Sequence, residues 1–248
     1  SKVIVEPRLL KLNFGIMCLH ILLMSTFVAL PGQLAAAGFP AAEHWKIYLV
    51  TMLISFVSVV PFIIYAEVKR KMKRVFMGCV ALLLIAEIVL WGAGPHFWEL
   101  IAGVQLFFLA FNLMEALLPS LISKESPAGY KGTAMGIYST SQFLGVAIGG
   151  SLGGWVDGLF DSQTVFLAGA LLAMLWLFVA SSMKEPRYVS SLRVEIPDDV
   201  AIGDALKQRL EATEGVSEVL IVPEERSAYV KIDSKVTNRF EVEQALKA

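Results

Sequence analysis

The chain has 248 residues, of which 56% are hydrophobic and 17% charged. Soluble domains carry about 25% charged residues, so this composition excludes a single soluble domain. Residues 1–188 hold 13 Lys/Arg and 10 Asp/Glu, whereas residues 189–248 hold 8 and 12. We therefore expect two unlike parts, a membrane bundle over 1–188 and a small soluble domain over 189–248. The net charge of −1 excludes a strongly basic nucleic-acid-binding protein.

Six apolar runs in the first part are long enough to cross a membrane. A bilayer core about 30 Å thick needs roughly 20 apolar helical residues per crossing. The sequence therefore predicts six transmembrane helices, half of a larger transporter-like bundle. They are expected near Leu12–Ala35, Lys46–Ala66, Val75–Ala93, Trp98–Ile122, Thr133–Val156 and Gln163–Met183.

Positive charge divides unequally between the two sets of connections. Twelve Lys/Arg fall on one side of the predicted membrane, whereas Lys46 is alone on the other. Short cytoplasmic connections are enriched in Lys and Arg. We therefore expect both ends of this chain to be cytoplasmic.

Two polar stripes run along the first and fourth predicted helices. Asn13 and His20 share one helical face, and Gln105, Asn112 and Glu115 share another. His20 and Glu115 lie at similar depth, roughly 12 and 10 Å from the cytoplasmic ends at 1.5 Å per residue. A facing His and Glu would titrate as a pair near physiological pH, which suits a proton relay. A neutral pair that locks two helices together is the alternative.

Glu87 is alone in the very apolar third run, with no basic residue nearby in sequence. A carboxyl group inside a bilayer is costly, so we expect Glu87 to contact protein. A structural or intersubunit role and a catalytic role both remain open.

Small residues form a seam on the fifth run. Gly145, Gly149 and Gly153 follow one another at steps of four, which places them on one helical face. This spacing predicts close packing against another helix. Such a seam would also let this helix slide against its neighbour when the bundle rocks.

Motifs for enzyme chemistry are missing from the sequence. It contains no H-E-x-x-H, no Walker loop and no G-x-S-x-G motif. Cys18 and Cys79 both lie in apolar runs, which favours neither a disulfide framework nor a Cys-based zinc site. We therefore expect no enzyme activity, no cofactor and no metal.

The segment Pro127–Gly136 carries the pattern P-x-x-x-[RK]-G-x-x-x-G through Lys131, Gly132 and Gly136. Together with six runs, this motif resembles the C-terminal half of the major facilitator superfamily, and in particular its bacterial inner-membrane members with an extra cytoplasmic domain. The basic connection containing Arg70, Lys73 and Arg74 resembles the second-half counterpart of that family's G-x-x-x-D-R-x-G-R-R loop, but it lacks both glycines. A positive anchor and a conformational switch are its two possible roles.

The resemblance implies a function for the bundle. In this family the first and fourth helices of each half line the central cavity, which would turn His20, Gln105, Asn112 and Glu115 toward substrate. It further implies a secondary transporter, a proton-coupled exporter of small drug-like molecules, whose N-terminal six-helix half is absent from this chain. The partners would be substrate, protons and the lipid bilayer, with no nucleic acid. The alternative is a membrane-anchored sensor or docking protein that does not transport.

The spacing of hydrophobic residues changes in the last 60 residues, from long apolar runs to short alternating and helical patterns. They predict a strand through Leu192–Ile196, a helix at Asp204–Ala212, strands at Val216–Val222 and Ala228–Ile232, and a helix at Arg239–Leu246. This βαββα order is that of a ferredoxin-like domain without its last strand. The domain also resembles heavy-metal-associated domains, but its first loop has no Cys, His or Met for a soft metal. We expect it to regulate, to dock a cytosolic partner or to self-associate.

Overall fold

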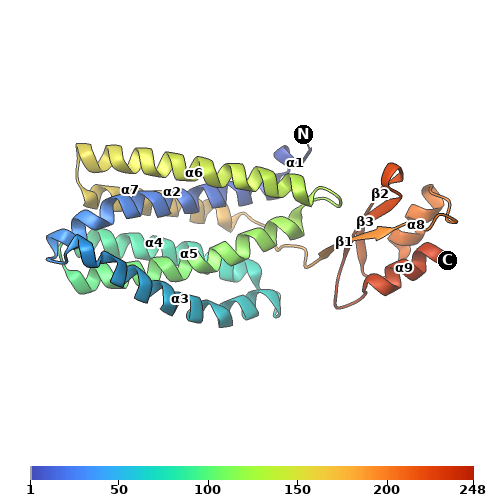
Figure 1. The fold of residues 1–248 in the computed structure, drawn as a ribbon, viewed down its shortest axis with the longest axis horizontal. Coiled ribbons are helices and arrows are strands. Elements are labelled where there is room, and N and C mark those ends of the chain that lie inside the picture. The colour runs from blue at the N-terminus through green and yellow to red at the C-terminus, as the bar shows by residue number, and fades with distance from the viewer. Residues whose placement is uncertain (1) are drawn as a thin grey trace. The chain divides into compact units, whose positions relative to one another are not determined.

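The computed structural model describes residues 2–248; position 1, where the first predicted domain begins, lies outside them. Long helices come first and a small sheet follows (Figure 1). The first part contains α1 (Lys2–Val5), α2 (Pro7–Ala36), the 3-10 turn η1 (Ala41–Glu43), α3 (His44–Glu67), α4 (Met72–Ala93), α5 (Phe97–Glu125), α6 (Lys131–Leu159) and α7 (Ser162–Ser181). The second contains β1 (Ser190–Glu195), α8 (Asp204–Ala212), β2 (Val216–Val222), the 3-10 turn η2 (Pro223–Glu225), β3 (Ser227–Ile232) and α9 (Arg239–Lys247).

The predicted fold class, a helical membrane bundle followed by a βαββα domain, is confirmed. Within the described residues, α2, α4, α5, α7 and the stretch Ala41–Glu67 that contains α3 are long and apolar enough to cross a membrane. The predicted run at 133–156 forms α6, but α6 is less apolar than the others because it carries eight glycines and several Ser and Thr residues. That α6 crosses the membrane stays a prediction.

Packing divides the described chain into two compact units. One comprises residues 10–119 and 137–185, and therefore most of α2–α7. The other comprises 2–9, 120–136 and 186–248, so the end of α5 and the start of α6 pack with the sheet. The predicted boundary near 188 follows the change of composition, whereas packing also assigns the α5–α6 connection to the C-terminal unit.

The core of the larger unit is built from apolar and aromatic contacts between helices. Trp176 of α7 is buried against Phe76 of α4, with ring centroids 6.0 Å apart at a near-perpendicular angle. Gly15 of α2 lies on the same indole, where a Cβ would stand 3.2 Å from Nε1. α3 is different, because only 22% of its most apolar window is buried. Its exposed apolar surface suits lipid rather than water.

Two helix boundaries have local causes. α2 ends at Ala36 and is capped by Gly38, whose φ of +84° is costly for other residues. Bonds from Gly38 N to Ala35 O and from Phe39 N to Leu34 O, both 3.0 Å, complete a Schellman cap. α7 begins after Asp161, whose carboxylate accepts a 2.7 Å bond from the Thr164 amide.

The sheet of the smaller unit has the strand order β1-β3-β2, with β3 antiparallel to both neighbours. α8 and α9 cover one face, where Val194, Val219 and Val230 join Leu206 and Leu210 in the core. The predicted order of elements is therefore correct, with shifts of one or two residues at some ends. The opposite face of β3 carries Ser227 and Lys231, which are also fully buried.

Candidate functional site

His20 of α2 and Glu115 of α5 face one another inside the larger unit. His20 Nε2 lies 3.4 Å from Glu115 Oε1, and the His20 side chain is 5% exposed against 36% for Glu115. His20 Nδ1 is 3.2 Å from the carbonyl of Ile16, a contact that requires Nδ1 to carry the hydrogen. Nε2 therefore remains for Glu115. Glu115 Oε1 has no hydrogen-bond partner among the described residues, so the 3.4 Å contact is a close approach of the two groups.

The surroundings of this pair are partly polar. Phe111 packs against the His20 ring, with centroids 5.7 Å apart. Asn13 lies about two turns of α2 away from His20; it is buried, and its Oδ1 has no hydrogen-bond partner among the described residues. Tyr138 of α6 is buried and lies within electrostatic range of the Glu115 carboxylate. The sequence reasoning did not single out Tyr138, although it follows the family motif by only two residues.

The residues of the second predicted stripe, on α5, contact two different helices: Glu115 faces α2, whereas Gln105 and Asn112 face α3. Gln105 Nε2 donates to the Thr51 carbonyl (3.1 Å) and to Ser55 Oγ (3.0 Å), both on α3. Asn112 Nδ2 lies 3.1 Å from Met52 Sδ on the same helix. Amide groups in apolar surroundings take the nearest partners, so these two side chains connect α5 to α3. Of the five residues in the two predicted polar stripes, the structure brings only His20 and Glu115 into contact with one another.

Glu87 of α4 points into its own bundle and is fully buried. Thr26 of α2 donates to Glu87 Oε1 at 2.5 Å. Oε2 has no hydrogen-bond partner within residues 2–248, and a Cβ on Gly169 of α7 would stand 2.8 Å from it. Glu87 therefore lies between α2 and α7. Its orientation could not be derived from the sequence, because Thr26 lies 61 residues away.

The glycines of the α6 seam lie against the backbone of α2. A Cβ on Gly145 would stand 2.5 Å from the Met17 carbonyl oxygen, and one on Gly149 would stand 2.6 Å from that of Ile21. One on Gly153 would approach the next turn of α2 at 2.8 Å. The helices are therefore close enough that larger residues at these positions would collide with backbone. Figure 1 shows α6 running beside α2.

The two loop motifs differ in their local geometry. In the α3–α4 connection Arg70 has a φ of +54°, a left-handed conformation that glycine adopts more easily. Arg74 Nη1 donates to the Tyr65 hydroxyl at 3.2 Å. Lys131 begins α6, and a Cβ on Gly132 or Gly136 would meet nothing within 4 Å. Packing within the described chain therefore does not require glycine at those two positions.

The smaller unit contains a polar cluster that sequence reasoning missed. Lys231 of β3 is fully buried, and its Nζ donates to the Ser123 carbonyl at 2.5 Å. Burial, reinforced by the nearby Arg187, lowers the pKa of Lys231 to about 8. Glu218 accepts a 2.9 Å bond from the Ala128 amide and pairs with Arg187 at 3.4 Å. These contacts join the sheet to the α5–α6 connection.

Comparison with known proteins defines the class. The family model described as Major Facilitator Superfamily matches residues 12–212, and the model described as YajR YAM domain matches 192–248. The chain belongs to the major facilitator superfamily and carries the additional C-terminal domain.

Curated relatives narrow the resemblance. The chain is 79% identical over 247 residues to the inner membrane transport protein YajR of Escherichia coli (strain K12), covering 100% of this chain and 54% of that protein. It is 40% identical over 135 residues to an uncharacterized transporter of Buchnera aphidicola subsp. Acyrthosiphon pisum, covering 54% of this chain and 35% of that protein. The chain spans about half the length of its relative in Escherichia coli. The expected resemblance to this branch of the family is confirmed.

Proposed function

We propose that this chain is the C-terminal half of a secondary active transporter in a bacterial inner membrane. Membership of the superfamily and the 79% identity to an inner membrane transport protein support this proposal. The other six-helix half would complete the substrate cavity, and rocking of the two halves would alternate access. Both ends of this chain would then lie in the cytoplasm, because the connections there carry twelve of its basic residues.

The His20–Glu115 pair is the proposed proton site, and its 3.4 Å separation is the observation that carries the proposal. Ionisable groups inside a membrane are energetically costly, so those that occur there usually face a partner, a cavity or a transport pathway. This pair joins α2 to α5, the two helices that the family places around the cavity. A shift of either helix would change the sharing of the proton and thereby couple protonation to movement. Export of small drug-like molecules against protons is the activity that fits this coupling.

The other predicted residues have supporting roles in this scheme. The buried Oδ1 of Asn13 has no hydrogen-bond partner in the part of the chain that the structure describes, which fits a substrate or water contact, whereas Gln105 and Asn112 fit the joining of α5 to α3. The α6 seam would provide the sliding contact with α2. Lys131 and the basic α3–α4 connection would lie at the cytoplasmic surface and form the moving gate and its anchor.

The C-terminal domain is proposed to regulate transport as a ferredoxin-like module. Its sheet bonds directly to the connection between α5 and α6 through Lys231 and Glu218. A cytosolic partner, or a second copy of residues 189–248, that competed for this face would change the position of α6. The same contacts support the alternative function, in which the bundle only anchors a docking domain.

The test is proton movement on substrate addition in vesicles that contain the full-length protein, meaning this chain joined to its proposed N-terminal half. A screen of cationic amphiphiles would supply the substrate. We expect His20→Ala and Glu115→Gln each to abolish proton exchange. Glu87→Gln is the matched control, because it alters a buried carboxyl group of the same bundle that does not contact His20.

Each outcome has a definite meaning. Loss of exchange in the two pair variants, with exchange retained in Glu87→Gln, supports the proposed site. Unchanged exchange in both pair variants would refute it and move proton coupling to the other half. The anchor function would be favoured if the unaltered protein transported no compound of the screen and its C-terminal domain still bound a cytosolic partner.

A further inference from the structure

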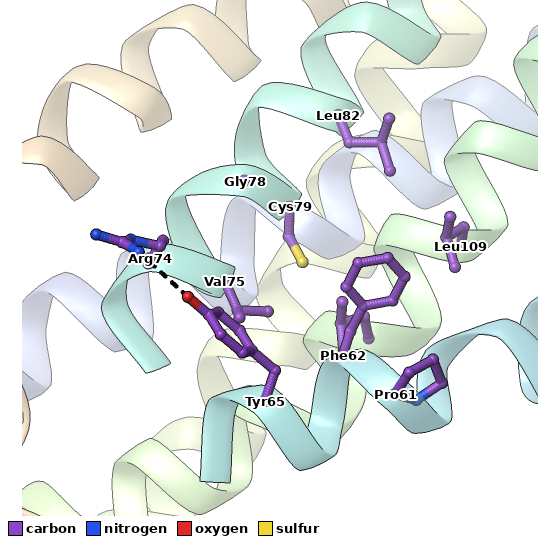
Figure 2. A pocket seen from close by; sticks show the side chains of 10 residues that line it. Pro61, Phe62, Tyr65, Arg74, Val75, Gly78, Cys79, Leu82 and Leu109 are labelled. Atoms are coloured by element: carbon purple, nitrogen blue, oxygen red, sulfur yellow. Dashed lines mark hydrogen bonds between the residues drawn. The ribbon is translucent and has the colours of Figure 1, made fainter. Parts of the chain in front are cut away.

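A cavity of about 490 Å³ lies between α3, α4 and α5, outside the His20–Glu115 site (Figure 2). Its walls are mainly apolar, with Phe62 from α3, Cys79 and Leu82 from α4 and Leu109 from α5. Two polar side chains, Tyr65 and Arg74, complete the lining. The cavity therefore combines an apolar chamber with a cationic group.

The polar groups lie at one end of the cavity. Tyr65 is near the last turn of α3 and Arg74 is in the first turn of α4, so both adjoin the α3–α4 connection. Leu82 follows Arg74 by eight residues, or about 12 Å along the helix. The chamber consequently extends from the basic connection toward the interior of the membrane span, a geometry that matches a polar head followed by an apolar chain.

The cavity opens on a surface that faces lipid by composition. Phe62 is 45% exposed, and its neighbour Ile64 is 51% exposed. A dissolved anion could reach Arg74 from the α3–α4 connection but would leave the apolar part of the chamber unfilled, whereas a membrane lipid has both a polar head and an apolar chain. The surrounding surface therefore favours a lipid over a dissolved anion.

The positive charge of the α3–α4 connection favours an anionic lipid over a neutral one. Lys69, Arg70, Lys71, Lys73 and Arg74 stand within six residues of one another in the connection. Clusters of this kind beside a membrane span attract anionic headgroups. Arg74 presents a planar guanidinium with five N–H donors, one of which reaches the Tyr65 hydroxyl, and this group suits a phosphate.

We propose that this cavity binds an anionic phospholipid of the inner leaflet, with its phosphate on Arg74 and Tyr65 and an acyl chain between α3, α4 and α5. The inference goes beyond transport and does not depend on the proton site. It assigns the basic connection a defined ligand in addition to general attraction to the membrane.

Two pairs of variants separate this site from general effects. Gly78 lines the cavity, and a Cβ there would meet nothing within 4 Å, so Gly78→Phe is expected to fill the chamber. Gly92→Phe is its control on the same helix, because Gly92 is also open but does not line the cavity. Arg74→Gln removes the phosphate donor, and Lys73→Gln removes an equal charge from the same turn.

The measurement is native mass spectrometry of the full-length protein titrated with dioleoyl phosphatidylglycerol or dioleoyl phosphatidylcholine. We expect Arg74→Gln to lower the affinity for phosphatidylglycerol about tenfold, the loss of one charge-assisted contact. Gly78→Phe should abolish the tightest bound lipid, while both controls stay within about twofold of the native protein.

Three results would overturn the proposal. Equal affinity for the two lipids would show that the charge of the headgroup plays no role. An equal loss of affinity for phosphatidylglycerol in Lys73→Gln and Arg74→Gln would show that the basic connection attracts the lipid only diffusely. Unchanged lipid binding in Gly78→Phe, accompanied by a lower melting temperature than in Gly92→Phe, would show that another segment of the protein fills the chamber.

Discussion

Adding one methyl group to the α6 seam at Gly149 tests how closely α6 and α2 are packed. A Cβ there would stand 2.6 Å from the Ile21 carbonyl oxygen and 2.8 Å from Ile21 Cα, whereas ordinary contacts are 3.4–4 Å. Both contacts are backbone atoms, which cannot rotate away as a side chain can. The helices would therefore have to separate by about 0.8 Å at this point.

We expect Gly149→Ala to lower the free energy of unfolding by about 2 kcal/mol, the usual cost of overpacking a well-packed contact. For a full-length protein about twice as long as this chain, that corresponds to a fall of about 2–4 °C in melting temperature. Gly150→Ala is the matched control, since a Cβ on Gly150 would meet nothing within 4 Å. It should leave the stability unchanged or raise it by up to about 1 kcal/mol through helix propensity.

The assay is thermal unfolding of the full-length protein in detergent, followed by intrinsic tryptophan fluorescence for the native protein and both variants. We expect Gly150→Ala to melt at or above the temperature of the native protein, and Gly149→Ala to melt below both. A Gly149→Ala variant that melts as high as Gly150→Ala would refute the close approach of the two helices.

Two further variants test buried polar contacts. Thr26→Val should lower the free energy of unfolding by about 1–3 kcal/mol because Glu87 Oε1 loses its donor; equal melting temperatures for this variant and the native protein would contradict the contact. Lys231 has a folded pKa of about 8 against 10.5 for the free side chain, so the unfolded state binds more protons between these values. Stability should therefore rise by up to about 2 kcal/mol from pH 7 to pH 9.5, measured as thermal unfolding at the two pH values. Lys231→Met should lose this increment, and an equal pH response in that variant would count against the assignment.

The elements of the fold could largely be predicted from the sequence because their causes are local. Runs of about 20 apolar residues define membrane helices, and a change from helical to alternating period marks the start of the small domain. The helix Asp204–Ala212 and the strand Val216–Val222 agree with the structure at both ends. α6 is less apolar than the other predicted membrane helices, since the glycines that let it pack closely also lower its hydropathy.

The candidate site could be predicted only in part. Helical spacing and depth were enough to bring His20 and Glu115 to one level, since both follow from the rise of a helix. Spacing could not tell which way the remaining side chains of the stripe turn. Gln105 and Asn112 bond to α3, whose Thr51 and Met52 lie more than 50 residues away, and no periodicity within α5 contains that information.

The sequence by itself therefore determined the class of protein, the order of its elements and the spacing of its glycine seam, because each depends on nearest neighbours along the chain. Tertiary structure alone decided which neighbour each buried polar group meets. Glu87 bonds to Thr26, and Lys231, which alternation along a lone strand would turn outward, is buried against Ser123. A buried polar group must find a partner in space, and the position of that partner is set only when the helices and the sheet have packed.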